Sequence, residues 1–169
     1  NPDVQDALLD VLRFWLERGV YGFRLDTVNY YFHDRKLRNN PAARLPRHLP
    51  YAVNPYDMQE HKYGKSQPEN VVFLTRVRKL LDQFPGTTTV GEVGDSHVGL
   101  KLMGEYTSGG DKLHMAYTFD MLGPQFTAEH FRSKMKRFFD ANKDGWPCWS
   151  FSNHDVDRHV SRWAKYAVD

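Results

Sequence analysis

The feature that most constrains the fold of this chain is a helix pattern followed directly by a strand pattern. The first helix begins at Asn1, a good N-cap residue, and ends at Gly19. Its apolar residues recur at helical spacing and form one stripe, made of Val4, Ala7, Leu8, Val11, Leu12, Trp15 and Leu16. The strand sequence GVYGFRLD follows at once.

The same order recurs three more times along the chain. Further helices are expected at residues 68–84, at about 97–105 and from the N-cap Thr127, each followed by a strand, at 87–95, 113–119 and 147–151. Strands that are joined by helices lie parallel in one sheet, so the predicted class is α/β. We expect the first helix to pack on the outside of this sheet through Leu8, Leu12 and Trp15.

A (β/α)8 barrel explains this repeat better than a nucleotide-binding fold does. No predicted strand is followed by the glycine-rich fingerprint that binds phosphates. A complete barrel needs about 250 residues, so four strands in 169 residues make about half of one. Asp26, Glu92 and the pair His154–Asp155 all fall at the C-terminal ends of strands, where such barrels carry their active sites.

Asp26 and Glu92 have the arrangement that sugar hydrolysis requires. An Arg24–Asp26 pair on one face of a strand is ordinarily a structural ion pair. Adjacent parallel strands, however, lie about 4.8 Å apart, so two carboxyl groups at their ends can face each other at about 5 to 5.5 Å, the spacing of retaining glycosidases. Arg24 would keep Asp26 ionised as a nucleophile. Glu92 has no adjacent cation in the sequence and is the better acid.

Composition and motifs argue against several other functions. The net charge is only +2 and no nucleic-acid-binding motif accompanies the basic stretches, so nucleic acid is not an expected partner. No apolar run reaches the length of a membrane span. The eight histidines show no metal-binding spacing, and the single Cys148 excludes an intrachain disulfide and a thiolate zinc cluster. We therefore expect no metal site and no cofactor in this chain.

A long segment at about residues 27–67 interrupts the regular repeat. Loops of this length are uncommon unless they are functional or disordered. The segment is rich in aromatic side chains, namely Tyr30, Tyr31, Phe32, His33, Tyr51 and Tyr56. This composition favours a loop that lines a substrate site over a disordered linker.

Three stretches together resemble glycoside hydrolase family 13, the α-amylase family. GFRLDTVN is similar to its second conserved region, GEVGD to its third and FSNHDVDR to its fourth, in the family's order and each after a strand. The resemblance implies that Asp26 is the nucleophile, supported by Arg24, and that Glu92 is the acid/base. It also implies that His154 and Asp155 grip sugar hydroxyls, with Asp155 stabilising the transition state, and that Arg158 contacts the substrate.

The match extends to the α-glucosidases and oligo-1,6-glucosidases of that family. Endo-acting amylases tend to carry a Lys-His pair where this chain has Asn29 and Tyr30, which favours an exo-acting enzyme. The residue after the nucleophile, here Thr27, points to α-1,4 rather than α-1,6 bonds. The resemblance thus implies a retaining α-glucosidase that acts on maltose, malto-oligosaccharides and also sucrose. A transglucosylase or sucrose isomerase is the closest alternative, and a non-catalytic relative such as a transporter heavy-chain ectodomain is a further one.

The resemblance also fixes what this segment would be. It corresponds to strands four to seven with their helices, so residues 1–169 are expected to form part of one catalytic barrel domain and to be inactive alone. The first conserved region is expected before Asn1, and a structural calcium ion, where the family has one, outside this segment. A cytoplasmic location is expected. Open sheet edges are expected on the strands nearest the two termini.

Overall fold

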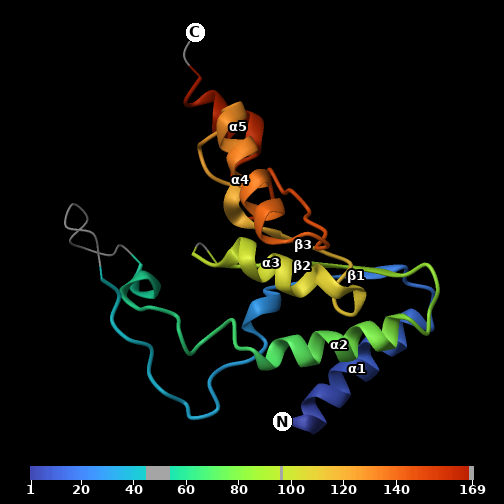
Figure 1. Cartoon of the computed structure of the whole chain (residues 1–169). Helices are drawn as coiled ribbons and strands as arrows, with labels where there is room; N and C mark the ends of the chain where they lie inside the picture. Colours follow the sequence, from blue (N-terminus) through green and yellow to red (C-terminus); the bar gives the residue numbers. More distant parts are fainter. Residues whose placement is uncertain (45–53, 96, 168–169) are drawn as a thin grey trace. The chain divides into compact units, whose positions relative to one another are not determined.

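A computed structural model describes residues 1–44, 54–95 and 97–167 of the chain (Figure 1). The helices are α1 (Pro2–Leu16), α2 (Glu69–Leu81), α3 (Gly99–Thr107), α4 (Ala128–Ala141) and α5 (His159–Ala164). The strands are β1 (Gly22–Leu25), β2 (Thr88–Val93) and β3 (Met115–Thr118), and short 3₁₀ turns occur at Val28–Tyr30, Pro55–Met58, Ser108–Gly110 and Phe119–Met121. The chain forms two compact units, Asn1–Val28 with Val71–Asp169, and Asn29–Asn70.

The three strands of the first unit form a parallel sheet in the order β1-β2-β3. This arrangement confirms the predicted parallel pairing of the first two strands, and β1 lies at one edge of the sheet. The register is tight around Gly91, where a Cβ atom would lie 2.5 Å from the Leu113 side chain and 3.1 Å from Val28. Only glycine fits between these two apolar groups.

The expected fourth strand is reduced to a single bridge in the described part of the chain. Pro147 pairs with Ala116 in parallel orientation, and the Cys148 N–H donates to the Ala116 carbonyl at 2.7 Å. Pro147 itself has no N–H to contribute to a ladder. The prediction of a full strand at 147–151 is therefore wrong, although its start lies beside β3 as expected.

The helix caps follow the sequence. The Asn1 side chain accepts from the Asp3 N–H at 2.8 Å, and the Thr127 hydroxyl accepts from the His130 N–H at 3.1 Å. Each bond satisfies one of the N–H groups that a helix leaves without a partner at its start. The six-residue helix α5 was not expected from the sequence.

The core of the first unit lies around the sheet and the apolar faces of three helices. Helix α3 packs on β2, β3 and α4. The buried apolar side chains of the helices include Phe73, Leu74, Val77, Leu80 and Leu81 of α2, Leu102, Met103 and Tyr106 of α3, and Phe138 of α4. The sheet and the segments at its ends also contribute buried apolar side chains, among them Leu25, Val28, Val93, Leu113, Ala116 and Tyr117.

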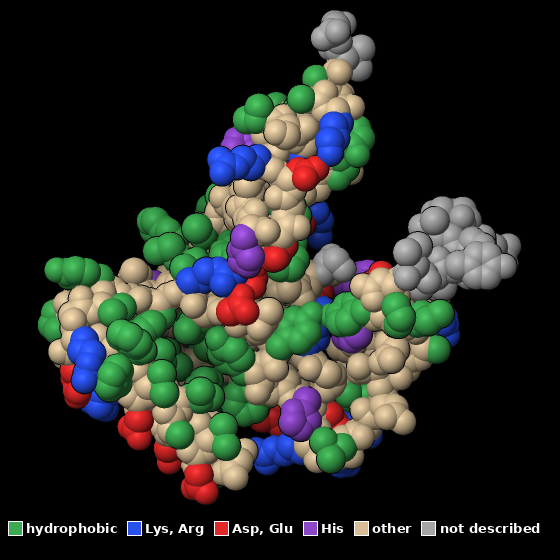
Figure 2. Space-filling model, turned by 180° about the vertical axis from the view of Figure 1, so that it is seen from behind, with side chains coloured by type: hydrophobic (Ala, Val, Ile, Leu, Met, Phe, Trp, Pro, Cys, Tyr) green, Lys and Arg blue, Asp and Glu red, His purple; other side chains and the backbone are tan. Residues whose placement is uncertain are grey.

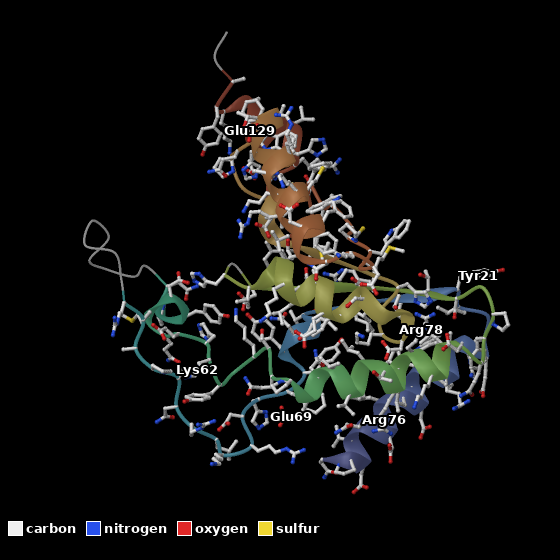
Figure 3. The ribbon with its side chains drawn as sticks, in the orientation of Figure 1. Tyr21, Lys62, Glu69, Arg76, Arg78 and Glu129 are labelled. Atoms are coloured by element: carbon white, nitrogen blue, oxygen red, sulfur yellow. The ribbon has the colours of Figure 1, made fainter. Side chains whose placement is uncertain are left out.

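Helix α1 departs from the expected packing. Its one buried side chain is Leu16, whereas Leu8 and Trp15 are 51% and 48% exposed. The helix instead contacts α2 through polar groups: Arg76 of α2 pairs with Asp6 and donates to Gln5 at 2.9 Å (Figure 3). The expectation that Leu8, Leu12 and Trp15 bury this helix against the sheet is thus wrong. Figure 2 shows hydrophobic side chains exposed on one face of the molecule.

The second unit, Asn29–Asn70, contains most of the long aromatic segment. Ala42 and Gln59 form an isolated antiparallel bridge, and the Asp34 N–H donates to the Tyr63 carbonyl at 2.8 Å. Asp34 is the polar centre of this unit: it accepts from Arg38 through both carboxylate oxygens, at 3.1 and 2.6 Å. Tyr51, one of the predicted lining residues, lies outside the described residues.

Candidate active site

Arg24 of β1 holds together the polar groups at the carboxyl end of the sheet. Its Nη1 lies 2.9 Å from Oδ1 of Asp26, and its Nη2 lies 2.8 Å from Oε1 of Glu92. Its Nε donates to the Tyr117 hydroxyl at 3.1 Å. One guanidinium therefore contacts two carboxylates and a phenol that come from three adjacent strands or their ends.

The sheet register explains why these groups meet. Leu25 pairs with Gly91, so the next residues, Asp26 and Glu92, follow at the same level, and Glu92 pairs with Tyr117. Side chains at one level of neighbouring parallel strands point the same way. The structure thus brings together the Asp26 and Glu92 carboxylates that the sequence singled out.

The two carboxylates have different surroundings. The Asp26 side chain is 67% exposed, whereas that of Glu92 is 4% exposed. Glu92 accepts from the Tyr117 hydroxyl through Oε1 at 2.9 Å and from the Thr27 N–H through Oε2 at 3.2 Å. Asp26 is thus open to an approaching molecule, while Glu92 is held from several sides.

Thr27 supplies its backbone to the site in an unusual conformation. Its φ is 42°, in the left-handed region that a β-branched residue rarely adopts. This conformation brings the Thr27 N–H to Glu92, while the side chain is exposed. Strained backbone of this kind costs on the order of 1 to 3 kcal/mol and tends to occur at functional sites.

The electrostatics favour an ionised Asp26. Hydrogen bonding with Glu92, and then with Arg24, lowers the pKa of Asp26, and the charge of Arg24 acts in the same direction. The hydrogen bond with Tyr117, followed by that with Asp26, raises the pKa of Arg24 above its ordinary value. At neutral pH the site therefore presents an exposed carboxylate beside a permanent cation.

The structure corrects one premise of the sequence analysis. Glu92 was expected to lack a neighbouring cation, because none is adjacent in the sequence. In the folded chain the parallel pairing of β1 with β2 places Arg24 against Glu92, at 2.8 Å. The different roles of the two carboxylates must therefore be argued from how exposed each side chain is and from the direction of its carboxyl group, not from the absence of a positive charge.

The fourth predicted region lies at the surface. His154 Nε2 is 3.6 Å from Oδ1 of Asp155, and both side chains are largely exposed. Arg158 is exposed and is the N-cap residue of α5. Within the described residues, neither Asp155 nor Arg158 forms a hydrogen bond or ion pair with Arg24, Asp26 or Glu92.

Tyr117 is the residue of this candidate site that the sequence analysis missed. The strand pattern at 113–119 located it, and its position at the carboxyl end of a strand matched that of Asp26 and Glu92. A tyrosine in a buried strand was the available indication, since a buried phenol normally requires a hydrogen-bond partner. Burial, reinforced by the bond to Glu92, raises the pKa of Tyr117, so the hydroxyl keeps its proton at neutral pH.

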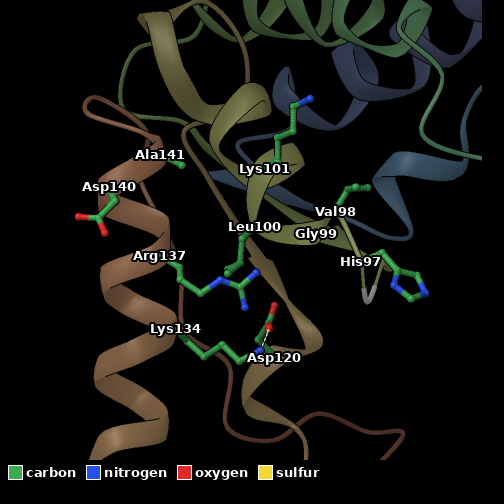
Figure 4. A pocket seen from close by; sticks show the side chains of 10 residues that line it. All are labelled: His97, Val98, Gly99, Leu100, Lys101, Asp120, Lys134, Arg137, Asp140 and Ala141. Carbon is green, nitrogen blue, oxygen red and sulfur yellow. Dashed lines mark hydrogen bonds and ion pairs between the residues drawn. The ribbon is translucent and has the colours of Figure 1, made fainter.

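A separate cavity of about 500 Å³ lies between the start of α3 and helix α4 (Figure 4). Lys134 of α4 pairs with Asp120 at 2.5 Å inside it, and Arg137 and Leu100 also line it. Neither Asp26 nor Glu92 is among its lining residues. The described residues contain no cluster of three or more metal-binding side chains and no helix long and apolar enough to cross a membrane.

Comparison with known proteins identifies the family. The model of the α-amylase catalytic domain matches residues 1–168. The chain belongs to the α-amylase family. Its neighbours in that family are (β/α)8 barrels, so the three parallel strands and their helices are part of such a barrel.

Individual members of the α-amylase family resemble the chain closely. It is 57% identical over 173 residues to a protein of Rhizobium meliloti (strain 1021) named "Probable alpha-glucosidase", and 30% identical over 180 residues to Maltase 1 of Drosophila virilis. These alignments cover the whole chain but 31% and 28% of the relatives. The crystal structure of an α-glucosyl transfer enzyme, XgtA, superposes with a TM-score of 0.86 at 46% identity, over 96% of this chain and 31% of that one.

Proposed function

We propose that this chain is the central part of the barrel of a retaining, exo-acting α-glucosidase. The observation that carries the proposal is the pair of carboxylates at one level of two adjacent parallel strands, both contacted by Arg24. Retaining glycosidases need such a pair at about 5 to 5.5 Å, so we expect the carboxyl carbons of Asp26 and Glu92 to lie within about 5 to 7 Å in the unliganded enzyme. A separation of about 9 Å would instead favour inversion.

The proposed reaction has two displacements at the anomeric carbon. In the first, a carboxylate oxygen of Asp26 forms a bond to C1 of the terminal glucose while the bond from C1 to the glycosidic oxygen breaks, and that oxygen takes the proton of Glu92. In the second, Glu92 accepts a proton from water as the water oxygen bonds to C1 and Asp26 leaves as a carboxylate. The product is α-glucose, with the configuration of the substrate retained.

The exposure of the two groups supports this division of roles. The nucleophile must be ionised and reachable, and Asp26 is exposed with a lowered pKa. We propose that Asp155 and His154 bind sugar hydroxyls once substrate is present, with Asp155 stabilising the transition state and Arg158 also contacting the substrate. Thr27, beside the nucleophile, biases the enzyme toward α-1,4 bonds in maltose and malto-oligosaccharides, and the segment 27–67 lines the substrate site.

Transfer of glucose to a second sugar is the alternative that a specific finding favours. The solved relative at 46% identity is named an α-glucosyl transfer enzyme. The glucosyl intermediate on Asp26 is the same for both outcomes, because a sugar hydroxyl can replace water in the second displacement. The chain spans about a third of the relatives it matches, so groups beyond it decide the balance.

Product analysis of the full-length protein tests the proposal. Maltose, isomaltose and sucrose are supplied separately, and proton NMR follows the anomer that forms first. We expect α-glucose as the first product and faster turnover of maltose than of isomaltose. First release of β-glucose would refute the retaining mechanism, and accumulation of longer saccharides in place of glucose would establish the transferase.

A further inference from the structure

The two oxygens of the Glu92 carboxyl group are in different situations. Oε1 accepts from the Tyr117 hydroxyl at 2.9 Å and lies 2.8 Å from Nη2 of Arg24. Oε2 accepts from the Thr27 N–H at the longer distance of 3.2 Å, and the Glu92 carboxyl group also hydrogen-bonds with Asp26. An oxygen with two short, charge-assisted contacts has little capacity left for a third partner. The carboxyl group is therefore held by one oxygen and less constrained at the other.

Given the proposed function, we infer that Tyr117 is a positioning residue that, with Arg24, occupies Oε1 of Glu92 and leaves Oε2 to carry the transferable proton. In the first displacement the proton leaves Oε2 for the glycosidic oxygen. In the second it returns to Oε2 from water. Tyr117 touches neither sugar nor water and acts only through the direction of the Glu92 carboxyl group.

The contacts of the Tyr117 hydroxyl suit it to this role. The hydroxyl accepts from Nε of Arg24, so its own proton is directed at Glu92. The residue lies in β3, directly across the register from Glu92, and is 7% exposed. The closed ring of bonds between Arg24, Tyr117 and Glu92 fixes the carboxyl rotation more firmly than one bond would.

The test is the Tyr117→Phe variant of the full-length protein, assayed on two substrates that differ in their need for a proton. Departure of a sugar from maltose requires protonation, whereas departure of fluoride from α-glucosyl fluoride requires little help from an acid. We expect kcat/KM on maltose to fall by about tenfold to a hundredfold, as for a misplaced catalytic group, and kcat/KM on the fluoride to change less than about threefold. The alkaline limb of the maltose pH profile should move to higher pH, because a donor to the ionised carboxyl is lost.

Thr118→Val is the matched control. Thr118 is the next residue of the same strand and is also buried, and its hydroxyl donates to Asp120 at 2.7 Å instead of to Asp26 or Glu92. Loss of the Thr118 hydroxyl should leave the ratio of kcat/KM on maltose to kcat/KM on α-glucosyl fluoride unchanged, and the pH profile on maltose as well. An equal loss on both substrates for Tyr117→Phe would show a merely structural role and overturn the inference.

Two further measurements each remove one dependence: the first does not need the phenylalanine variant to fold, and the second does not need the proposed activity. Replacement of Tyr117 by 3-fluorotyrosine keeps its shape and strengthens the donor, so the alkaline limb should move to lower pH. A crystal structure of Tyr117→Phe should show the Glu92 carboxyl rotated away from its contact with Arg24. If the Glu92 carboxyl is not rotated in the variant, the positioning role is overturned, whether or not the protein hydrolyses glucosides. If the carboxyl is rotated in the variant but the wild-type protein is inactive, only the proposed function is refuted.

Discussion

At the residue scale, the chemistry of the site depends on the shared cation Arg24. Each of its three guanidinium nitrogens contacts a different partner, so both carboxylates and the phenol are fixed by one side chain. The planar fork of arginine makes this possible, and a lysine at this position could not reproduce it. The exposed Asp26 carboxylate is the group whose ionisation this arrangement supports.

The first residue-scale prediction concerns Asp26, the proposed nucleophile. Asp26→Asn in the full-length protein should lower kcat by a factor on the order of 10⁴ or more while sugar binding remains measurable by calorimetry, because only the attacking oxygen is removed. Azide should restore turnover and give a glucosyl azide of inverted configuration. Asp157→Asn, another exposed and ion-paired aspartate, should be near normal. Near-normal activity of Asp26→Asn would eliminate the nucleophile assignment.

The second residue-scale prediction concerns linkage preference at Thr27. Thr27→Val keeps a β-branched side chain at φ 42°, so the backbone strain is unchanged and the substitution isolates the hydroxyl. We expect the ratio of isomaltose to maltose kcat/KM to rise by about tenfold, within the range that one small group in a pocket supplies. If the ratio stays the same, this side chain does not read the linkage.

At the scale of elements, a pH-dependent ion pair organises the Asn29–Asn70 unit. The Arg38 guanidinium lowers the pKa of Asp34 to about 2, assisted by the Arg38 and Lys36 backbone N–H groups. Because the folded-state pKa lies below the ordinary value of 3.8, the stabilisation is present above about pH 4 and is lost as the pH falls through about 2. The protection factors for hydrogen exchange at the Lys36 and Arg38 amides, measured relative to the intrinsic rate at each pH, should fall over this interval.

A variant pair separates this contact from general acid destabilisation. Arg38→Met should accelerate exchange at the same amides already at pH 5, because the carboxylate loses its main partner. Lys36→Gln changes a neighbouring charge but keeps the backbone donor, and should exchange like the wild type. Equal protection in Arg38→Met and wild type at pH 5 would show that the ion pair does not hold this turn.

Local patterns predicted these elements well where neighbouring residues decide the structure. The caps Asn1 and Thr127 and the three strands follow from side-chain chemistry and periodicity alone. The failures have two kinds of cause. The stretch after Pro147 is limited by a missing donor, which is a local property that the strand pattern did not take into account. The Arg24–Glu92 contact arises only from strand pairing, and the partners of Tyr117 follow from the register, so local patterns alone could not predict these contacts.

At the scale of the whole molecule, the described residues form three parallel strands where a closed barrel has eight. Its first helix exposes about half of each of four apolar side chains: Val4, Leu8, Val11 and Trp15, at 56%, 51%, 54% and 48%. Such a stripe on a helix ordinarily packs against a neighbour. The relatives, of which this chain covers about a third, have the additional length to supply one.

We therefore predict that a protein limited to residues 1–169 hydrolyses no maltose, whereas the full-length protein does. The open sheet edges and the apolar face of α1 should also make the short protein bind a hydrophobic dye strongly and self-associate in size-exclusion chromatography. Replacing Leu8 and Val11 with glutamate should reduce dye binding and self-association of the short protein, because these side chains are exposed there. The same replacement should lower the Tm of the full-length protein by several degrees, because a neighbouring element covers these side chains there. Measurable turnover of maltose by the short protein would show that the site needs no closed barrel, and an unchanged Tm of the full-length variant would show that the α1 face stays exposed.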